Sequence, residues 1–181
     1  DAVAWDLTPT EEPSLGLSVS RPVLAHVRID NQVRGGAIVG GGEDPNYDQA
    51  DDPRWGAVGR CLLFIDAVTG EVLHKLQGDN GATGFQYPVV GSPAVYPQNH
   101  NPVEQIYIGD RAGQFWRVDL EGQTPNEWKL QRLWPLQNVE GDQADFVRGI
   151  GFAITERPSL AFASNNDRII LFSTSQLSND Q

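Results

Sequence analysis

Short apolar stretches alternate with turn residues along the chain, and helical periodicity is almost absent. The apolar stretches are rich in β-branched residues and are bounded by Gly, Pro, Asn or Asp, a pattern typical of short strands joined by turns. The segment YIGDRAGQFWRVDLEG, residues 107–122, shows the unit: an apolar run, a tight turn, a second apolar run and another turn. The pattern predicts an all-β fold.

Two signatures recur in phase along the chain. The first is an apolar run that ends at Asp6, Asp66 and Asp119, with spacings of 60 and 53 residues. The second is a proline-containing run, seen in SRPVLA, GSPAVY and ERPSLAF, which another apolar run follows after a short gap. Two independent signatures in phase indicate an internal repeat.

The second repeat predicts four short antiparallel strands, near residues 92–96, 106–109 and 114–120 and within WKLQRLW. Four such strands make one blade of a β-propeller. We therefore predict a partial, quinoprotein-like β-propeller of about three blades' worth. The predicted parts are the end of a preceding blade (1–10), a first full blade (15–80) with a long loop at 42–59, a second full blade (86–140) and the first half of a following blade (150–178). Because three blades cannot close a propeller, we expect the chain to be part of a larger one.

The composition of the chain argues against several classes of function and structure. The net charge of −11, from 24 acidic and 13 basic residues, argues against nucleic-acid binding. No apolar stretch is long enough for a membrane helix, so membrane insertion is not expected. The single cysteine, Cys61, excludes an intrachain disulfide and is expected to be buried and inert. The absence of Met, even at position 1, suggests a processed or excised segment.

The long insertion holds the candidate site residues. Asp44, Asn46 and Asp48 alternate in EDPNYDQADD, and alternating oxygen donors can converge on Ca²⁺ from a tight loop. The sharp-turn Gly and the closing Glu of an EF-type loop are missing, so a solvated acidic loop is the competing interpretation. Tyr47 and Trp55 are the candidate partner-binding residues; alternatively, Trp55 folds back over the edge of its blade.

No catalytic constellation is present in the sequence. There is no Gly-x-Ser-x-Gly elbow, no P-loop pattern and no zinc-type histidine spacing. The leading hypothesis is therefore a non-enzymatic binding and scaffolding propeller. The alternatives are a quinoprotein dehydrogenase, which would hold pyrroloquinoline quinone and Ca²⁺ at the propeller centre, and a repeat scaffold of the WD type.

The segments LLFIDAVTGEVLHKL, VVGSPAVYP and IYIGDRAGQFWRVDL resemble the PilC/PilY-type proteins of type IV pili, over about residues 15–173. The resemblance implies a C-terminal β-propeller in a long exported protein at the pilus tip, outer membrane or extracellular surface. Such proteins support pilus assembly, surface adhesion and twitching motility. The implied partners are pilus proteins such as minor pilins, or the rest of the same propeller.

Several members of that family carry a calcium loop between the first and second strands of a blade. The matching positions here lie within residues 96–104, where only Glu104 keeps a carboxylate. The calcium function is therefore not carried over to this stretch. The sequence assigns no cofactor, with Ca²⁺ as the open alternative.

Overall fold

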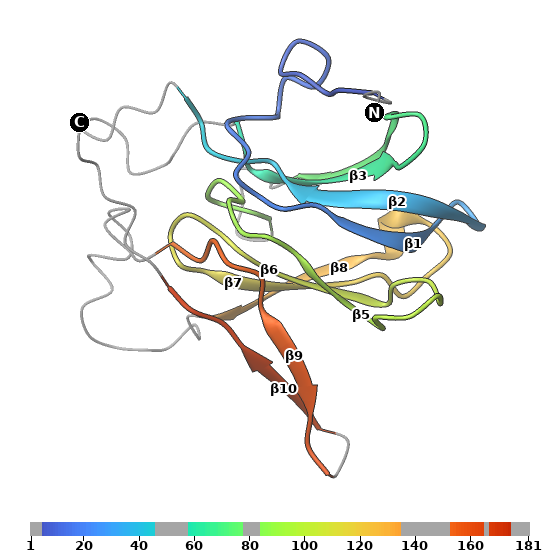
Figure 1. The fold of residues 1–181 in the computed structure, drawn as a ribbon, viewed down its shortest axis with the longest axis vertical. Coiled ribbons are helices and arrows are strands. Elements are labelled where there is room, and N and C mark those ends of the chain that lie inside the picture. The colour runs from blue at the N-terminus through green and yellow to red at the C-terminus, as the bar shows by residue number, and fades with distance from the viewer. Residues whose placement is uncertain (1–4, 46–57, 78–83, 135–152, 165–166, 175–181) are drawn as a thin grey trace, which may run out of the picture.

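The computed structural model describes residues 5–45, 58–77, 84–134, 153–164 and 167–174. These residues form two four-stranded antiparallel sheets and one two-stranded hairpin. The first sheet has the order β1-β2-β3-β4, the second β5-β6-β7-β8, and the hairpin pairs β9 with β10 (Figure 1). The strands are β1 (Val23–Ile29), β2 (Gln32–Gly40), β3 (Cys61–Asp66), β4 (Val72–Gln77), β5 (Ala94–Tyr96), β6 (Gln105–Gly109), β7 (Phe115–Asp119), β8 (Lys129–Trp134), β9 (Ser159–Phe162) and β10 (Arg168–Leu171).

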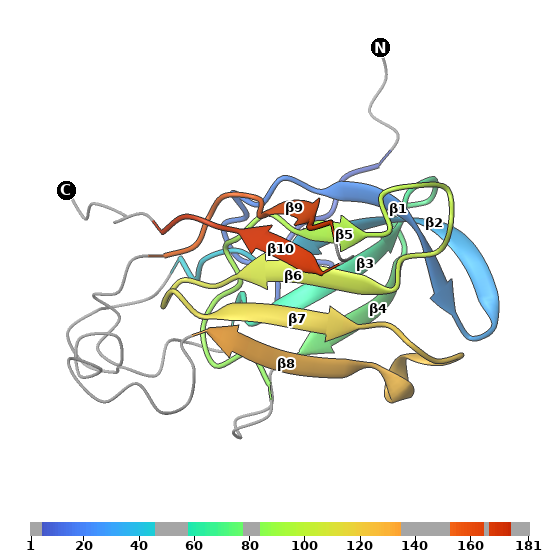
Figure 2. The same cartoon turned by 90° about the horizontal axis from the view of Figure 1, so that it is seen from below.

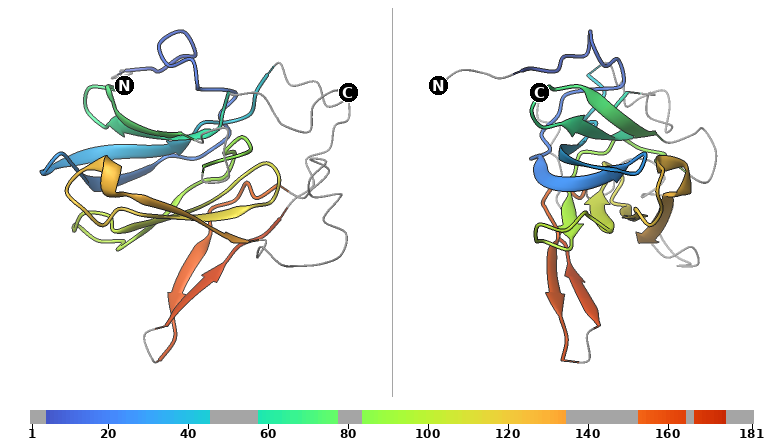
Figure 3. Two further views of the ribbon diagram at one scale, coloured as in Figure 1. Left: turned by 180° about the vertical axis from the view of Figure 1, so that it is seen from behind. Right: turned by 90° about the vertical axis from the view of Figure 1, so that its right-hand side faces the viewer.

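The two sheets and the hairpin are stacked in chain order. Figure 3 shows the first sheet above the second, with the hairpin extending on the far side of the second sheet. Seen from below, the hairpin lies in front of the second sheet (Figure 2). Each layer therefore packs against the next along the chain.

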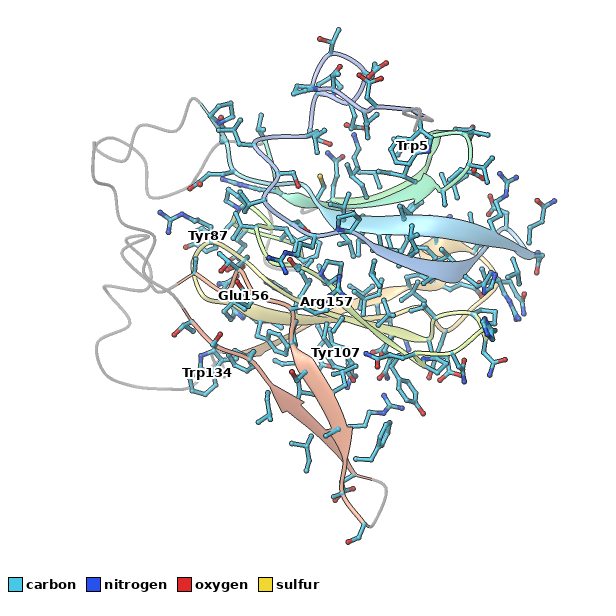
Figure 4. The ribbon with its side chains drawn as sticks, in the orientation of Figure 1. Trp5, Tyr87, Tyr107, Trp134, Glu156 and Arg157 are labelled. Atoms are coloured by element: carbon cyan, nitrogen blue, oxygen red, sulfur yellow. The ribbon has the colours of Figure 1, made fainter. Side chains whose placement is uncertain are left out.

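Strand β3 shows why its sequence is apolar at nearly every position. Leu62 and Phe64 point into the core between the two sheets, whereas Leu63 and Ile65 point to the outer face of the first sheet. Trp5 and Leu7 pack against that outer face (Figure 4 shows Trp5). Because successive side chains in a strand alternate between faces, a strand covered on both sides has no polar face.

A third cluster joins the second sheet to the hairpin. It contains the buried side chains of Tyr107, Phe115 and Ile154, with Leu160 of β9 and Ile170 of β10 packed against them. Strand β6 therefore contributes side chains to two hydrophobic clusters, because Ile106 and Ile108 face the first sheet whereas Tyr107 faces the hairpin.

The all-β prediction is confirmed, and the four strands expected in the second repeat correspond to β5–β8. Trp116 is buried in the core between the sheets. The turns DRAG and AVTG join β6 to β7 and β3 to β4, and each has a glycine of positive φ, Gly113 (77°) and Gly70 (78°). No strand precedes Val23 among the described residues, and the division into blades stays a prediction. Among the described residues, no helix has the length and apolarity needed to span a membrane.

Candidate partner-binding surface

The insertion between β2 and β3 leaves the first sheet from a stem formed by residues 40–45 and 58–60. The N–H of Gly42 donates to the carbonyl of Val89 (3.0 Å), and the N–H of Gly59 donates to the carbonyl of Ser14 (2.8 Å). Gly42 and Gly59 both have positive φ, 85° and 80°. A Cβ atom on Gly59 would overlap the carbonyl oxygen of Gly42, so the two sides of the stem approach as closely as only glycine permits.

Glu43 connects the stem to two other parts of the chain. Its backbone forms a reciprocal pair with Leu17, with N···O distances of 2.7 and 2.9 Å. Its carboxylate accepts a hydrogen bond from Nε of Arg111 in the second sheet's β6–β7 turn (2.8 Å). The Arg111 side chain is 4% exposed and that of Glu43 is 36% exposed. A largely buried charge-assisted hydrogen bond therefore links the stem to the neighbouring sheet.

Asp110, beside Arg111, is fully buried. Its Oδ1 accepts hydrogen bonds from the backbone N–H groups of Ala112 (3.0 Å) and Gln114 (2.8 Å), and its Oδ2 accepts one from Nε1 of Trp116 (2.9 Å). In the side-chain orientation of Gln114 that gives both its amide oxygen and its amide nitrogen a partner, the nitrogen also donates to Asp110 Oδ2 (3.0 Å). This carboxylate holds the tight turn in shape.

Burial raises the pKa of Asp110 to about 7, although the hydrogen bonds from Trp116, Gln114 and Ala112 act in the opposite direction. The Asp110 backbone carbonyl also accepts a hydrogen bond from the N–H of Ile154 (3.1 Å), and the N–H of Arg111 donates to the carbonyl of Pro88 (2.9 Å). The turn thus connects the second sheet both to the segment before β5 and to the segment before β9.

The sequence-predicted site residues fall mostly outside the described residues. Asn46, Tyr47, Asp48 and Trp55 all lie in the range 46–57, for which no placement is described. Asp44 is described and is half-buried in the stem. Across the described part of the chain, no three His, Cys, Asp or Glu side chains are grouped so as to hold a metal ion.

The stretch matching the family's calcium loop has its own contacts. The Tyr96 ring packs against the Arg168 guanidinium, 4.1 Å from its centroid, and the Asn99 side chain accepts a hydrogen bond from the N–H of Asn101 (2.9 Å). His100 is exposed, and the N–H of Glu104 donates to the carbonyl of Tyr96 (2.8 Å). These contacts close the β5–β6 loop without drawing carboxylates together.

Cys61 lies beneath the stem and is fully buried. Its Sγ lies 3.5 Å from Oγ of Ser14, and burial raises the pKa of the thiol. Ser14 in turn donates to the carboxylate of Glu12, which pairs with Lys75 (2.8 Å). The expected buried position of Cys61 is confirmed, and a raised pKa keeps the thiol in its unreactive form.

The sequence did not reveal that Asp110 and Arg111 are buried or that Arg111 pairs with the partly exposed Glu43. The available signal was the turn GDRAGQFWR, in which an Asp followed by a Gly and then a Trp is typical of a turn. The burial of Asp110 and Arg111 depends on segments 20–70 residues away, among them the stem at Glu43.

Comparison with known proteins finds similarity to PilY1 proteins. No family model matches the chain. The type IV pilus biogenesis factor PilY1 homolog of Xylella fastidiosa is 21% identical over 170 residues, and PilY1 of Pseudomonas aeruginosa is 27% identical over 127 residues. The crystal structure of the Pseudomonas aeruginosa PilY1 C-terminal domain matches 96% of the chain with a TM-score of 0.66 at 24% identity. The chain is thus similar in sequence to PilY1 proteins and shares the fold of the PilY1 C-terminal domain.

The similarity covers most of this chain but little of the relatives' own length. The matches span 84% and 68% of the chain, but only 11% and 9% of the two PilY1 proteins. The chain likewise spans 35% of the solved PilY1 chain. The PilY1 relatives therefore contain much more polypeptide than the segment compared, and what they do as whole proteins is not transferred by the match itself.

Proposed function

We propose that the chain is a non-enzymatic segment of a PilY1-like type IV pilus biogenesis factor, in which it supports pilus assembly, surface adhesion and twitching motility. The match of its fold to the PilY1 C-terminal domain, over 96% of the chain, is the observation that carries this proposal. The proposal includes an exported protein at the pilus tip, outer membrane or extracellular surface.

We further propose that the two sheets are successive blades of a β-propeller and that the hairpin is the first half of the next blade. Each sheet has four antiparallel strands in chain order, as a blade does. Each layer also packs face to face with the next along the chain. The larger propeller would be completed by polypeptide that pairs with the hairpin.

The insertion 42–59 is the proposed contact surface for pilus proteins, such as minor pilins, or for the rest of the propeller. Its support is the stem, which backbone hydrogen bonds and the Glu43–Arg111 pair fix to both sheets. A loop on a rigid scaffold is a common solution for binding. Within it, Tyr47 and Trp55 are the proposed partner contacts, and Asp44, Asn46 and Asp48 the proposed Ca²⁺ ligands.

The proposal is tested in the bacterium that carries the protein. Deletion of its gene is expected to reduce surface pili and abolish twitching, and the wild-type gene to restore both. A second gene encodes a variant in which a Gly-Ser linker of equal length replaces residues 46–57. We expect this variant to be present at normal levels but not to restore surface pili or twitching fully. The matched control replaces Asp30 and Asn31, in the β1–β2 turn, by Gly-Gly, which suits their positive φ values of 49° and 63°.

Normal pili and normal twitching in the deletion strain would contradict the pilus role. Purification of the native protein with a redox-active quinone would contradict its non-enzymatic character. Full restoration by the linker variant would leave the pilus role standing but would remove the insertion as its contact surface.

A further inference from the structure

A groove lies between β1 of the first sheet and β5 of the second, which Figure 1 and Figure 2 show beside each other. It encloses about 500 Å³ and adjoins a second hollow of about 240 Å³. Leu24, Ala25, Asn99 and His100 line both hollows. The larger hollow therefore lies along the edge of β1 that faces away from β2, whereas the smaller one extends over β1 to Gly35 and Gly36 of β2.

The backbone of β1 faces this groove with hydrogen-bonding groups. The carbonyl of His26 accepts a hydrogen bond from the N–H of Val103 (2.8 Å), so His26 directs its backbone groups away from β2. Leu24, two residues earlier in the same strand, has the same orientation. Among the described residues, neither the N–H and C=O of Leu24 nor the N–H of His26 has a hydrogen-bond partner across this edge. An unpaired strand edge of this kind can accept an added strand.

The groove also differs in charge from the rest of the chain. The sequence carries a net charge of −11, but within the described part of the chain no Asp or Glu lines either hollow. Arg157 lines the larger hollow, and its guanidinium carries a positive charge. The local charge is therefore complementary to a carboxylate.

The side chain of Arg157 lies at the mouth of the groove and contacts two backbone carbonyl groups there. One of its terminal nitrogens lies 3.4 Å from the carbonyl of Arg21 and 3.3 Å from that of Pro22. Figure 4 shows it on the segment that leads into β9. Its other N–H donors have no partner within the described part of the chain. Since a guanidinium has five donors, this leaves several for a ligand.

We propose that this groove binds an extended, carboxylate-bearing segment of a partner protein. The segment's backbone pairs with β1 at Leu24, and its carboxylate accepts hydrogen bonds from Arg157. Strand addition of this type takes its affinity from main-chain hydrogen bonds and its selectivity from side-chain contacts. The inference rests on the groove alone and does not depend on the pilus role or on the insertion.

The test uses the full-length protein and a fluorescein-labelled peptide, Gly-Val-Thr-Val-Asp-Val-Glu, whose alternating residues favour the extended form. The same peptide with Asn and Gln in place of Asp and Glu, and an amidated C-terminus, is the control ligand. Fluorescence anisotropy is expected to show saturable binding of the acidic peptide only, with a dissociation constant of about 1 mM or tighter. Hydrogen–deuterium exchange is expected to slow at the amides of Leu24 and His26.

Two pairs of variants separate the proposed contacts from effects on folding. Arg157→Gln is expected to weaken binding by about threefold or more, whereas Arg34→Gln, which removes an exposed arginine on β2, is expected to leave it unchanged. Leu24→Pro removes the outward N–H at an edge strand, where proline is tolerated, and is expected to abolish exchange protection at the amide of His26. Leu24→Ala keeps the N–H and is expected to retain that protection.

Three results would each overturn the proposal. One is the absence of saturable acidic-peptide binding up to about 5 mM. Another is equal binding of the acidic and amide peptides, or an equal effect of Arg157→Gln and Arg34→Gln. The third is exchange protection that appears elsewhere but not at β1. None of these results bears on the pilus phenotype, so the two proposals fail separately.

Discussion

At the scale of single residues, the buried carboxylate of Asp110 organises the turn between β6 and β7. Backbone and side-chain N–H groups satisfy both of its oxygens, and its own carbonyl binds the segment that leads to the hairpin. A buried carboxylate in a turn is costly without such donors. Asp110 is therefore a structural residue whose titration is linked to folding.

The raised pKa of Asp110 predicts a pH dependence of stability. Because the folded-state pKa is about 7 and the ordinary value is 3.8, the folded protein favours the protonated form. The resulting stabilisation is fully present below about pH 4 and is lost as the pH rises through about 7, by up to about 4 kcal/mol. Urea unfolding of the wild type and of Asp110→Asn at pH values from 4 to 8 gives the free energy of unfolding of each protein. The change with pH in the difference between these two free energies measures the contribution of Asp110.

Asp110→Asn cannot titrate, so its stability should lack this contribution at every pH. Its amide nitrogen also faces the donor Nε1 of Trp116, and we expect an additional loss of about 1–3 kcal/mol. A wild-type minus variant difference that stays constant with pH would contradict the linkage. A stability difference that grows with pH would mean that folding lowers the pKa of Asp110 instead of raising it.

At this scale the sequence identified the turn but not its burial. The residues GDRAGQFWR predict a tight turn because Asp and Gly satisfy local backbone requirements. The full burial of Asp110 and Arg111 depends on Pro88, Glu43 and Ile154, which lie far away in the chain. Local pattern carries no information about those contacts.

At the scale of elements, aromatic side-chain contacts and close backbone packing join the hairpin β9–β10 and its flanking residues to the second sheet. Phe172 stacks on Phe115 with ring centroids 4.3 Å apart, and Arg168 packs over Tyr96. Gly109, at the end of β6, makes room for Ile154: a Cβ atom there would overlap the Ile154 side chain and lie 2.8 Å from its carbonyl oxygen. The junction therefore requires a glycine for reasons of space.

Gly109→Ala is expected to destabilise the protein by about 1–3 kcal/mol, because the added methyl group must displace the segment before β9. The matched control is Gly35→Ala in β2, where an added Cβ atom would have no neighbour within 4 Å. That variant should be neutral or slightly stabilising, because alanine lowers the entropy of the unfolded chain. Chemical denaturation of the two variants makes the comparison, and an equal loss in both would contradict the packing argument.

At the scale of the whole molecule, the hairpin has only two strands and exposes apolar side chains. Leu171 is 63% exposed and Ile169 is 43% exposed, and these two share one face of β10. Two-stranded hairpins with an open edge usually gain further strands. This face and edge are the surface on which the proposed propeller would continue.

Residues 1–181 produced alone should therefore self-associate in a concentration-dependent way. Leu171→Lys is expected to shift the molecule towards the 19.9 kDa monomer, because it places a charge on the exposed face of the hairpin. Val68→Lys, at an 80% exposed position in the β3–β4 turn, is the control and should not change the association. Size-exclusion chromatography with light scattering measures the masses, and a monomeric wild type at all concentrations would contradict the prediction.

The sequence by itself determined the all-β class, the in-phase repeat and the positions of the strands and turns in the second sheet. These follow from apolar runs and turn-forming residues, which are local properties of the chain. Only the tertiary structure decided which polar groups are buried at the β6–β7 turn and how Glu43 and Arg111 fix the stem. It also decided that β1 and β5 border a groove with no acidic residue among its described lining residues. Each of these features needs segments distant in the sequence to meet, and the pattern along a single strand does not specify which segments those are.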